Sequence, residues 1–280
     1  PCIASMPHLV RWNEDLGDAG LAVIGMHVQS ATEEQVKAKT KALGMKFSVT
    51  KGGSISGVKV EGIPHCALFD HTGKLVYEGH TNKVEPKLRE AFANMLAADA
   101  GETPTKGVAG VLDLFKKGGS AADLVRKLTT LKDDADGNTA KQSKAISAKL
   151  QSGAQARLDE AKANIKDDPI AAYDAAVQTA ARWKGTALGK SAGEVVEKLK
   201  NERPVWNEMK ARPTLEKVRA AEAAIMKAAK AEPGSDEFKK AFAPQLKQLD
   251  TTLKALKKQY PDAPATAEAE EIAGRLGVGK

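Results

Sequence analysis

The sequence changes character near residue 97, and this change constrains the fold more than any other feature. Before it, short apolar runs that favour strands alternate with helical patterns, as in α/β sheet domains. After it, the strand signal disappears and Ala, Lys and Glu dominate. A chain of 280 residues has material for about two domains. We therefore expect an α/β domain at residues 1–98 and a helical domain at residues 99–280.

Residues 1–98 contain several sequence patterns that predict strands and turns. Residues 21–28 form a compact apolar run that is typical of a buried strand. Thr32 is a candidate N-cap for the helix that follows it. Two short strands, at 65–70 and 75–77, flank a glycine-containing turn that predicts a hairpin. Pro86, a suitable first-turn residue, opens a further helix.

The second part reads as a series of amphipathic helices. Apolar residues recur every three or four positions from Ile146 to Ile165, which predicts one long helix. Ser191 and Glu194 fit a capping box at the start of another. Pro244 is expected to kink or break a helix near the end of the chain.

A weak internal repeat matches four residues to four others at one constant offset: Trp183, Ala192, Val195 and Leu199 against Tyr260, Ala269, Ile272 and Leu276. The turn after the second aromatic residue resembles the turns of tetratricopeptide-like helical hairpins, but the full signature of those repeats is missing. A helical-hairpin array and chance similarity among amphipathic helices both remain open.

Charge and hydropathy exclude some function classes. Residues 1–100 carry 11 basic and 11 acidic side chains, so 32 of the 43 basic and 25 of the 36 acidic residues lie beyond them. The basic residues there are interspersed with Asp and Glu, which favours solvated helix surfaces over a nucleic-acid site. No apolar run approaches the roughly 20 residues of a membrane-spanning helix. We expect neither nucleic acid nor a membrane span.

The cysteines and histidines are few. Cys2 and Cys66 are too few for a disulfide framework and form no metal-type pair. All five histidines lie in the first part, and no two have a metal-ligand spacing. We therefore predict no metal and no cofactor.

Three motifs, in order, carry a resemblance to a known family. They are the segment that begins Pro1-Cys2 and ends Met6-Pro7, then Gly62-Ile63-Pro64, then a stretch over residues 69–76 that reads Phe-Asp-His-Thr-Gly-Lys-Leu-Val. Together they resemble the TlpA/ResA-like thiol-disulfide oxidoreductases over roughly residues 1–96. The resemblance implies a thioredoxin-like α/β domain, lacking its first strand in this chain, followed by an all-α helical domain.

The resemblance also assigns roles. Cys2 corresponds to the resolving cysteine of a Cys-x-x-Cys site, so the nucleophilic cysteine would stand two positions before Pro1. A helix N-terminus suits this chemistry because its unpaired amides stabilise a thiolate. Pro64 corresponds to a cis-proline, and Ile63 would offer its backbone to an extended substrate. We expect further N-terminal residues in the working protein.

Two neighbours of that proline have open roles. His65 takes the place of a small residue in the family, where it would tune the thiolate or hold a metal; the simpler interpretation is a partly exposed polar residue. Cys66 is a candidate for a disulfide with Cys2 or for a metal site with His65. Its place on a strand favours a third interpretation, a small apolar side chain in the core.

The leading hypothesis is an enzyme, a protein disulfide reductase, whose helical domain positions it on a protein partner. The resemblance, and nothing in the composition, implies a periplasmic or otherwise extracytoplasmic location of the bacterial type. The alternative is a redox-inactive scaffold that acts through its helical domain. Trp183, Trp206 and Tyr260 are candidate partner anchors there, but such residues more often seal helix packing.

Overall fold

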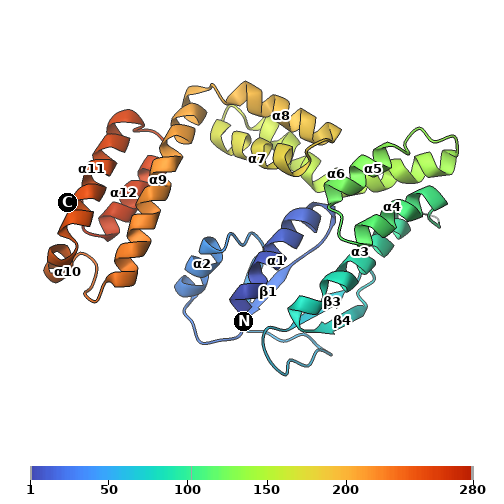
Figure 1. The fold of residues 1–280 in the computed structure, drawn as a ribbon, viewed down its shortest axis with the longest axis horizontal. Helices are drawn as coiled ribbons and strands as arrows, with labels where there is room; N and C mark the ends of the chain where they lie inside the picture. The colour runs from blue at the N-terminus through green and yellow to red at the C-terminus, as the bar shows by residue number, and fades with distance from the viewer. Residues whose placement is uncertain (1, 102, 279–280) are drawn as a thin grey trace. The chain divides into compact units, whose positions relative to one another are not determined.

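The computed structural model describes residues 2–101 and 103–278 and is mostly helical, with 66% of residues in helices (Figure 1). By internal packing the chain falls into two compact units. The first comprises residues 1–159 and 179–191, and the second comprises residues 160–178 and 192–280. The predicted domain boundary after residue 98 follows composition, whereas these units follow packing.

The strands of the first unit form two separate pairs. Strand β1 (Ile24–His27) runs parallel to β2 (Ser48–Lys51), with Ile24 opposite Ser48, and helix α2 (Glu33–Ala42) connects them. Thr32 caps that helix as expected: its hydroxyl accepts from the amide of Gln35, whose side chain accepts from the Thr32 amide in return.

The second pair is the predicted hairpin. Strand β3 (Cys66–Phe69) pairs with β4 (Leu75–Gly79) in antiparallel fashion. In the turn, the carboxylate of Asp70 accepts hydrogen bonds from the amides of Thr72 and Lys74. Gly73 has a φ of +83°, which only glycine adopts without strain. Local turn chemistry therefore suffices to form this hairpin.

The expected thioredoxin-like α/β domain followed by an all-α domain is wrong. The described residues are predominantly helical, and their four strands make two unconnected sheets of two strands each. Residues 21–80 include no buried residue, so no shared core unites the pairs. An isolated two-stranded sheet is marginally stable, and Ile24 on β1 is 65% exposed. The alternation of strand and helix signals was correct locally but did not produce one α/β sheet.

Helices supply the core of the first unit. They are α1 (Cys2–Leu16), the short η1 (Gly17–Ala19), η2 (Thr81–Lys83), α3 (Glu85–Asp99), α4 (Lys106–Lys116), α5 (Ala121–Thr129) and most of α6 (Gly137–Ala163). Phe92 of α3 and Phe115 of α4 are both buried, with ring centroids 6.0 Å apart. The guanidinium of Arg89 lies over the Phe115 ring and donates to the carbonyls of Phe115 and Gly119. This arginine therefore ties α3 to the end of α4.

The remaining helices are α7 (Pro169–Arg182), α8 (Ala187–Leu199), α9 (Arg203–Ala228), α10 (Asp236–Ala241), α11 (Ala243–Gln259) and α12 (Pro264–Arg275). The predicted break at Pro244 lies where α10 ends and α11 begins. The predicted capping box at Ser191 is wrong, because α8 begins four residues earlier. There the hydroxyl of Thr186 accepts from the amide of Gly189.

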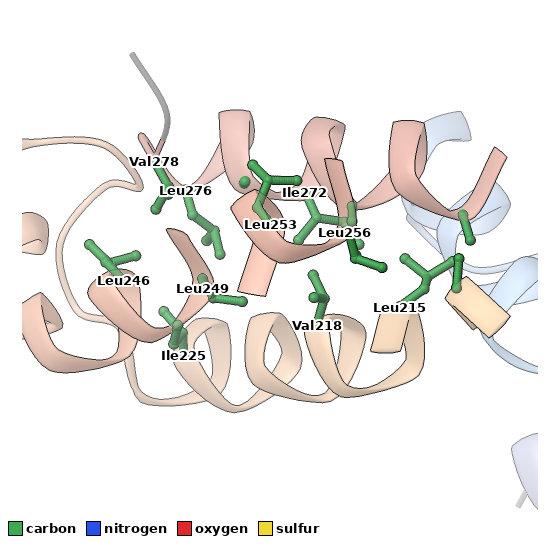
Figure 2. Close-up of a cluster of buried hydrophobic side chains, with 14 of the residues drawn as sticks. Leu215, Val218, Ile225, Leu246, Leu249, Leu253, Leu256, Ile272, Leu276 and Val278 are labelled. Atoms are coloured by element: carbon green, nitrogen blue, oxygen red, sulfur yellow. The ribbon is translucent and has the colours of Figure 1, made fainter. Parts of the chain in front are cut away.

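The second unit is organised around a three-helix core. Helices α11 and α12 pack on α9, and Figure 2 shows Leu215, Val218 and Ile225 of α9 facing leucines of α11 and Ile272 of α12. Ile272 is 1% exposed. The second copy of the weak repeat, from Tyr260 to Leu276, thus lies in a helical hairpin that is closed against a third helix.

A buried carboxylate joins α9 to α12. Glu208 is 5% exposed and accepts from the Nε of Arg212 at 2.8 Å and from the amide of Ala265 at 2.9 Å. The second bond satisfies a free amide in the first turn of α12, where a negative charge is also favoured. Arg212 in turn makes a bidentate pair with Asp174, at 2.6 Å for each bond.

Replacing Ile272 with Ala should lower the free energy of unfolding by about 2–5 kcal/mol, because it leaves a cavity in this core. Met226→Ala is the control: Met226 lies on α9 with 47% of its surface exposed, and we expect a change within about 0.5 kcal/mol. Urea unfolding followed by circular dichroism measures both. Equal midpoints for the two variants would contradict the assignment of the core.

Replacing Glu208 with Ala should cost about 1–3 kcal/mol of stability, because the Ala265 amide and one Arg212 donor lose their acceptor. The matched control is Glu197→Ala, which removes a carboxylate that is 68% exposed and pairs with Lys200. The same urea measurement applies. A loss no larger than that of the control would show that the α12 amide finds another acceptor.

Candidate functional site

Cys2 is the first residue of α1, and its side chain is partly exposed. The helix is held in place three residues later, where the buried hydroxyl of Ser5 accepts from Thr81 at 3.1 Å. Ile3, next to Cys2, is 56% exposed. The thiol therefore lies in the first described turn of this helix, next to an exposed apolar side chain.

Ile63 and Pro64 lie in the loop that leads into β3. The peptide bond between them is cis. The side chain of Ile63 is 43% exposed, so this residue lies at the protein surface. The segment places Ile63, Pro64, His65 and Cys66 at the start of one edge strand of the hairpin.

His65 is a half-buried neighbour of an acidic residue. Its Nε2 atom lies 3.5 Å from Oε1 of Glu78 on β4, and this nitrogen has no hydrogen-bond partner among the described residues. Glu78 instead accepts a 2.7 Å hydrogen bond from the amide of Lys59. The carboxylate is thus positioned by the chain before the hairpin and is close enough to pair with a protonated imidazole.

Cys66 is a free thiol, and burial raises its pKa to about 11. The pKa of Tyr77 is also raised, mainly by burial and in part by the charge of the neighbouring Cys66. A thiol that ionises near pH 11 is poorly nucleophilic at neutral pH. Of the two thiols, Cys66 is the one unsuited to exchange chemistry.

The structure brings together only part of the predicted site. Residues 63–66 are contiguous, but no hydrogen bond or ion pair within residues 2–101 joins Cys2 to any of them. The resemblance also predicts that Cys2 faces Pro64 across a shared pocket, and this stays a prediction. The expected nucleophilic cysteine, two positions before Pro1, lies outside the described residues.

Two other properties bear on function. Within the described ranges, no three His, Cys, Asp or Glu side chains are grouped so that they would hold a metal ion. None of the helices formed by these residues combines the length and the apolar character that crossing a membrane requires.

Sequence reasoning missed a charge cluster that the fold assembles from distant segments. The carboxylate of Asp18, in η1, is 3% exposed and pairs with Arg157 of α6 and with Arg182 of α7, the latter at 2.8 Å. Gly153 permits the contact, because a Cβ there would lie 2.7 Å from the carbonyl oxygen of Asp18. No motif connects these residues, and only the fold places them together.

No known protein family, curated protein or solved structure matches the chain.

The raised pKa of Cys66 predicts how its alkylation depends on pH. Iodoacetamide reacts with the thiolate, so the rate at Cys66 should rise about tenfold per pH unit from pH 7 and level off only near pH 11. Mass spectrometry of the labelled peptides measures the rate, and the urea-unfolded chain, with an ordinary thiol, is the reference. A plateau near pH 9 in the folded protein would contradict the partial burial of this thiol.

Proposed function

We propose that the protein is a thiol-disulfide oxidoreductase in which Cys2 is the resolving thiol. The observation that carries the proposal is the contrast between its two cysteines. Both thiols are partly exposed, but burial raises the pKa of Cys66 to about 11, which disfavours its thiolate at neutral pH. Cys2, at the start of the described part of α1, is therefore the better candidate for exchange.

The chemistry requires a second, attacking cysteine, which the resemblance places just upstream of Cys2. Its thiolate attacks a substrate disulfide, forms a mixed disulfide and releases one substrate thiolate. The Cys2 thiolate then attacks the sulfur of the attacking cysteine, forms a disulfide within the protein and releases the second substrate thiolate. The substrate disulfide gains two electrons, and the pair of protein thiols loses them.

Ile63 and His65 complete the proposed site. Ile63 is exposed at the start of an edge strand, where an extended substrate chain has backbone groups to pair with. His65 is poised against Glu78, and a protonated imidazole there would add positive charge near a substrate thiolate. The substrate class is therefore a protein disulfide, and the bacterial periplasm or another extracytoplasmic compartment is the proposed location.

A reduction assay with insulin tests the proposal on the full-length protein. The Cys2→Ser variant should lose turnover, because the mixed disulfide can no longer be resolved. It should also accumulate a covalent insulin adduct, visible on a non-reducing gel.

Cys66→Ser is the matched control, since it removes the other thiol and should leave turnover within about twofold. An intact protein that does not reduce insulin, or a Cys2→Ser variant that turns over normally, would defeat the proposal.

One observation favours the second candidate, a binding scaffold. Trp206 and Met209 are adjacent on the surface of α9 and are 44% and 39% exposed. The Trp206 ring meets Tyr260 edge to face, with centroids 6.1 Å apart, and Lys210 lies over it. Exposed aromatic and methionine side chains are common at protein interfaces. A scaffold would be inert toward insulin and would lose its partner on Trp206→Ala.

A further inference from the structure

One oxygen atom of Glu78 lies close to both ends of the segment that carries Ile63, residues 60–64, which we call the docking segment. Oε1 of this β4 residue accepts a 2.7 Å hydrogen bond from the amide of Lys59, which precedes the segment. The same oxygen lies 3.5 Å from Nε2 of His65, which follows it. A single carboxylate oxygen is therefore shared by the two residues that flank the docking segment.

The register of the hairpin explains why Glu78 reaches His65. Ala67 of β3 is directly opposite Glu78, and His65 stands two residues before Ala67, on the same face of the chain. Side chains in such diagonal positions are within reach of each other when they are long. The side chains of Glu78 and His65 are 29% and 16% exposed, so water only partly screens the attraction between the carboxylate and a protonated imidazole.

The docking segment has few other constraints. Within the part of the chain that the structure describes, the backbone of residues 60–64 makes no hydrogen bond. None of these residues is buried, and Val60 and Ile63 are 61% and 43% exposed. Packing therefore contributes little to their position. Strand pairing holds the chain after the segment, and the bond from Lys59 to Glu78 holds it immediately before.

We propose that Glu78 is a positioning residue for substrate docking, because its carboxylate holds the two ends of the docking segment in place. This inference rests on the proposed function, in which Ile63 offers its backbone to a substrate chain. A segment that is already ordered loses less conformational entropy when a chain pairs with it, so binding is tighter. Loss of Glu78 should accordingly weaken docking and leave the rate of thiol exchange unchanged.

Amide hydrogen exchange at Lys59, followed by NMR on the full chain, tests the anchor. Glu78→Ala removes the acceptor and should speed exchange of this amide about tenfold, since hydrogen bonds to charged groups are the stronger kind. Glu78→Gln keeps a neutral acceptor, so its rate should be intermediate. The matched control is Glu90→Ala, which removes a carboxylate of α3 that is 54% exposed and pairs with Lys87. It should leave the Lys59 rate within about twofold.

Fluorescence anisotropy with a labelled insulin B chain tests docking apart from thiol chemistry. The cysteines of this probe are alkylated, so it has no disulfide to reduce. The Kd should be weaker by about fivefold or more for Glu78→Ala, intermediate for Glu78→Gln and unchanged for Glu90→Ala. In the insulin-reduction assay, Glu78→Ala should raise KM by a similar factor and leave kcat within about twofold.

The positioning role and the oxidoreductase activity fail on different results. The positioning role is overturned if Glu78→Ala leaves the Lys59 exchange rate unchanged, if it binds the alkylated probe as well as the wild type does, or if the wild type shows no saturable binding. A fall in kcat with an unchanged KM also overturns it. A full-length protein that binds the probe in this Glu78-dependent way but does not reduce insulin supports the positioning role and overturns only the thiol chemistry.

Discussion

One buried carboxylate, that of Asp18, connects the first helix to helices that follow much later in the chain. Arg157 lies 139 residues further on, and both it and Arg182 pair with this single acid. The Asp18 carboxylate is 3% exposed, and the free energy that its burial costs is offset by pairing with the two arginines. Removing both arginines would leave this carboxylate buried without a charged partner. The order of the first unit therefore depends on an interaction between segments that share no local pattern.

Local chemistry made several elements predictable from the sequence. The cap at Thr32, the turn around Gly73 and the break at Pro244 each depend on residues within a few positions of one another. The strand pairing was not predictable in the same way. Whether short strands join one sheet depends on contacts between distant segments, and here the segments form two pairs. The cap at Thr186 was missed because Ser191, five residues later, is followed by Glu194 and offered a capping-box pattern.

The candidate site shows the same contrast between residues that the sequence identifies and contacts that only the fold creates. Ile63 and Pro64 were identified from a family resemblance, and His65 and Cys66 as their neighbours; because the four are contiguous, the structure places them together at one strand end. The charge cluster around Asp18 had no signal in the sequence, since Asp18, Arg157 and Arg182 lie far apart in the chain. The environment of Cys66 likewise required coordinates, because burial sets the ionisation of its thiol. Sequence thus identified candidate chemical groups, and the fold determined their surroundings.

The absence of any buried side chain between residues 21 and 80 has a consequence for motion. Regions with few packed apolar contacts open at a small fraction of the free energy that global unfolding requires. Amide protons in both strand pairs should exchange with solvent by local opening. Those of the helical cores should exchange only when the cores unfold cooperatively. The residues around Pro64 belong to this sparsely packed region. A chain that paired with β3 would therefore stabilise the part of the protein that opens most easily.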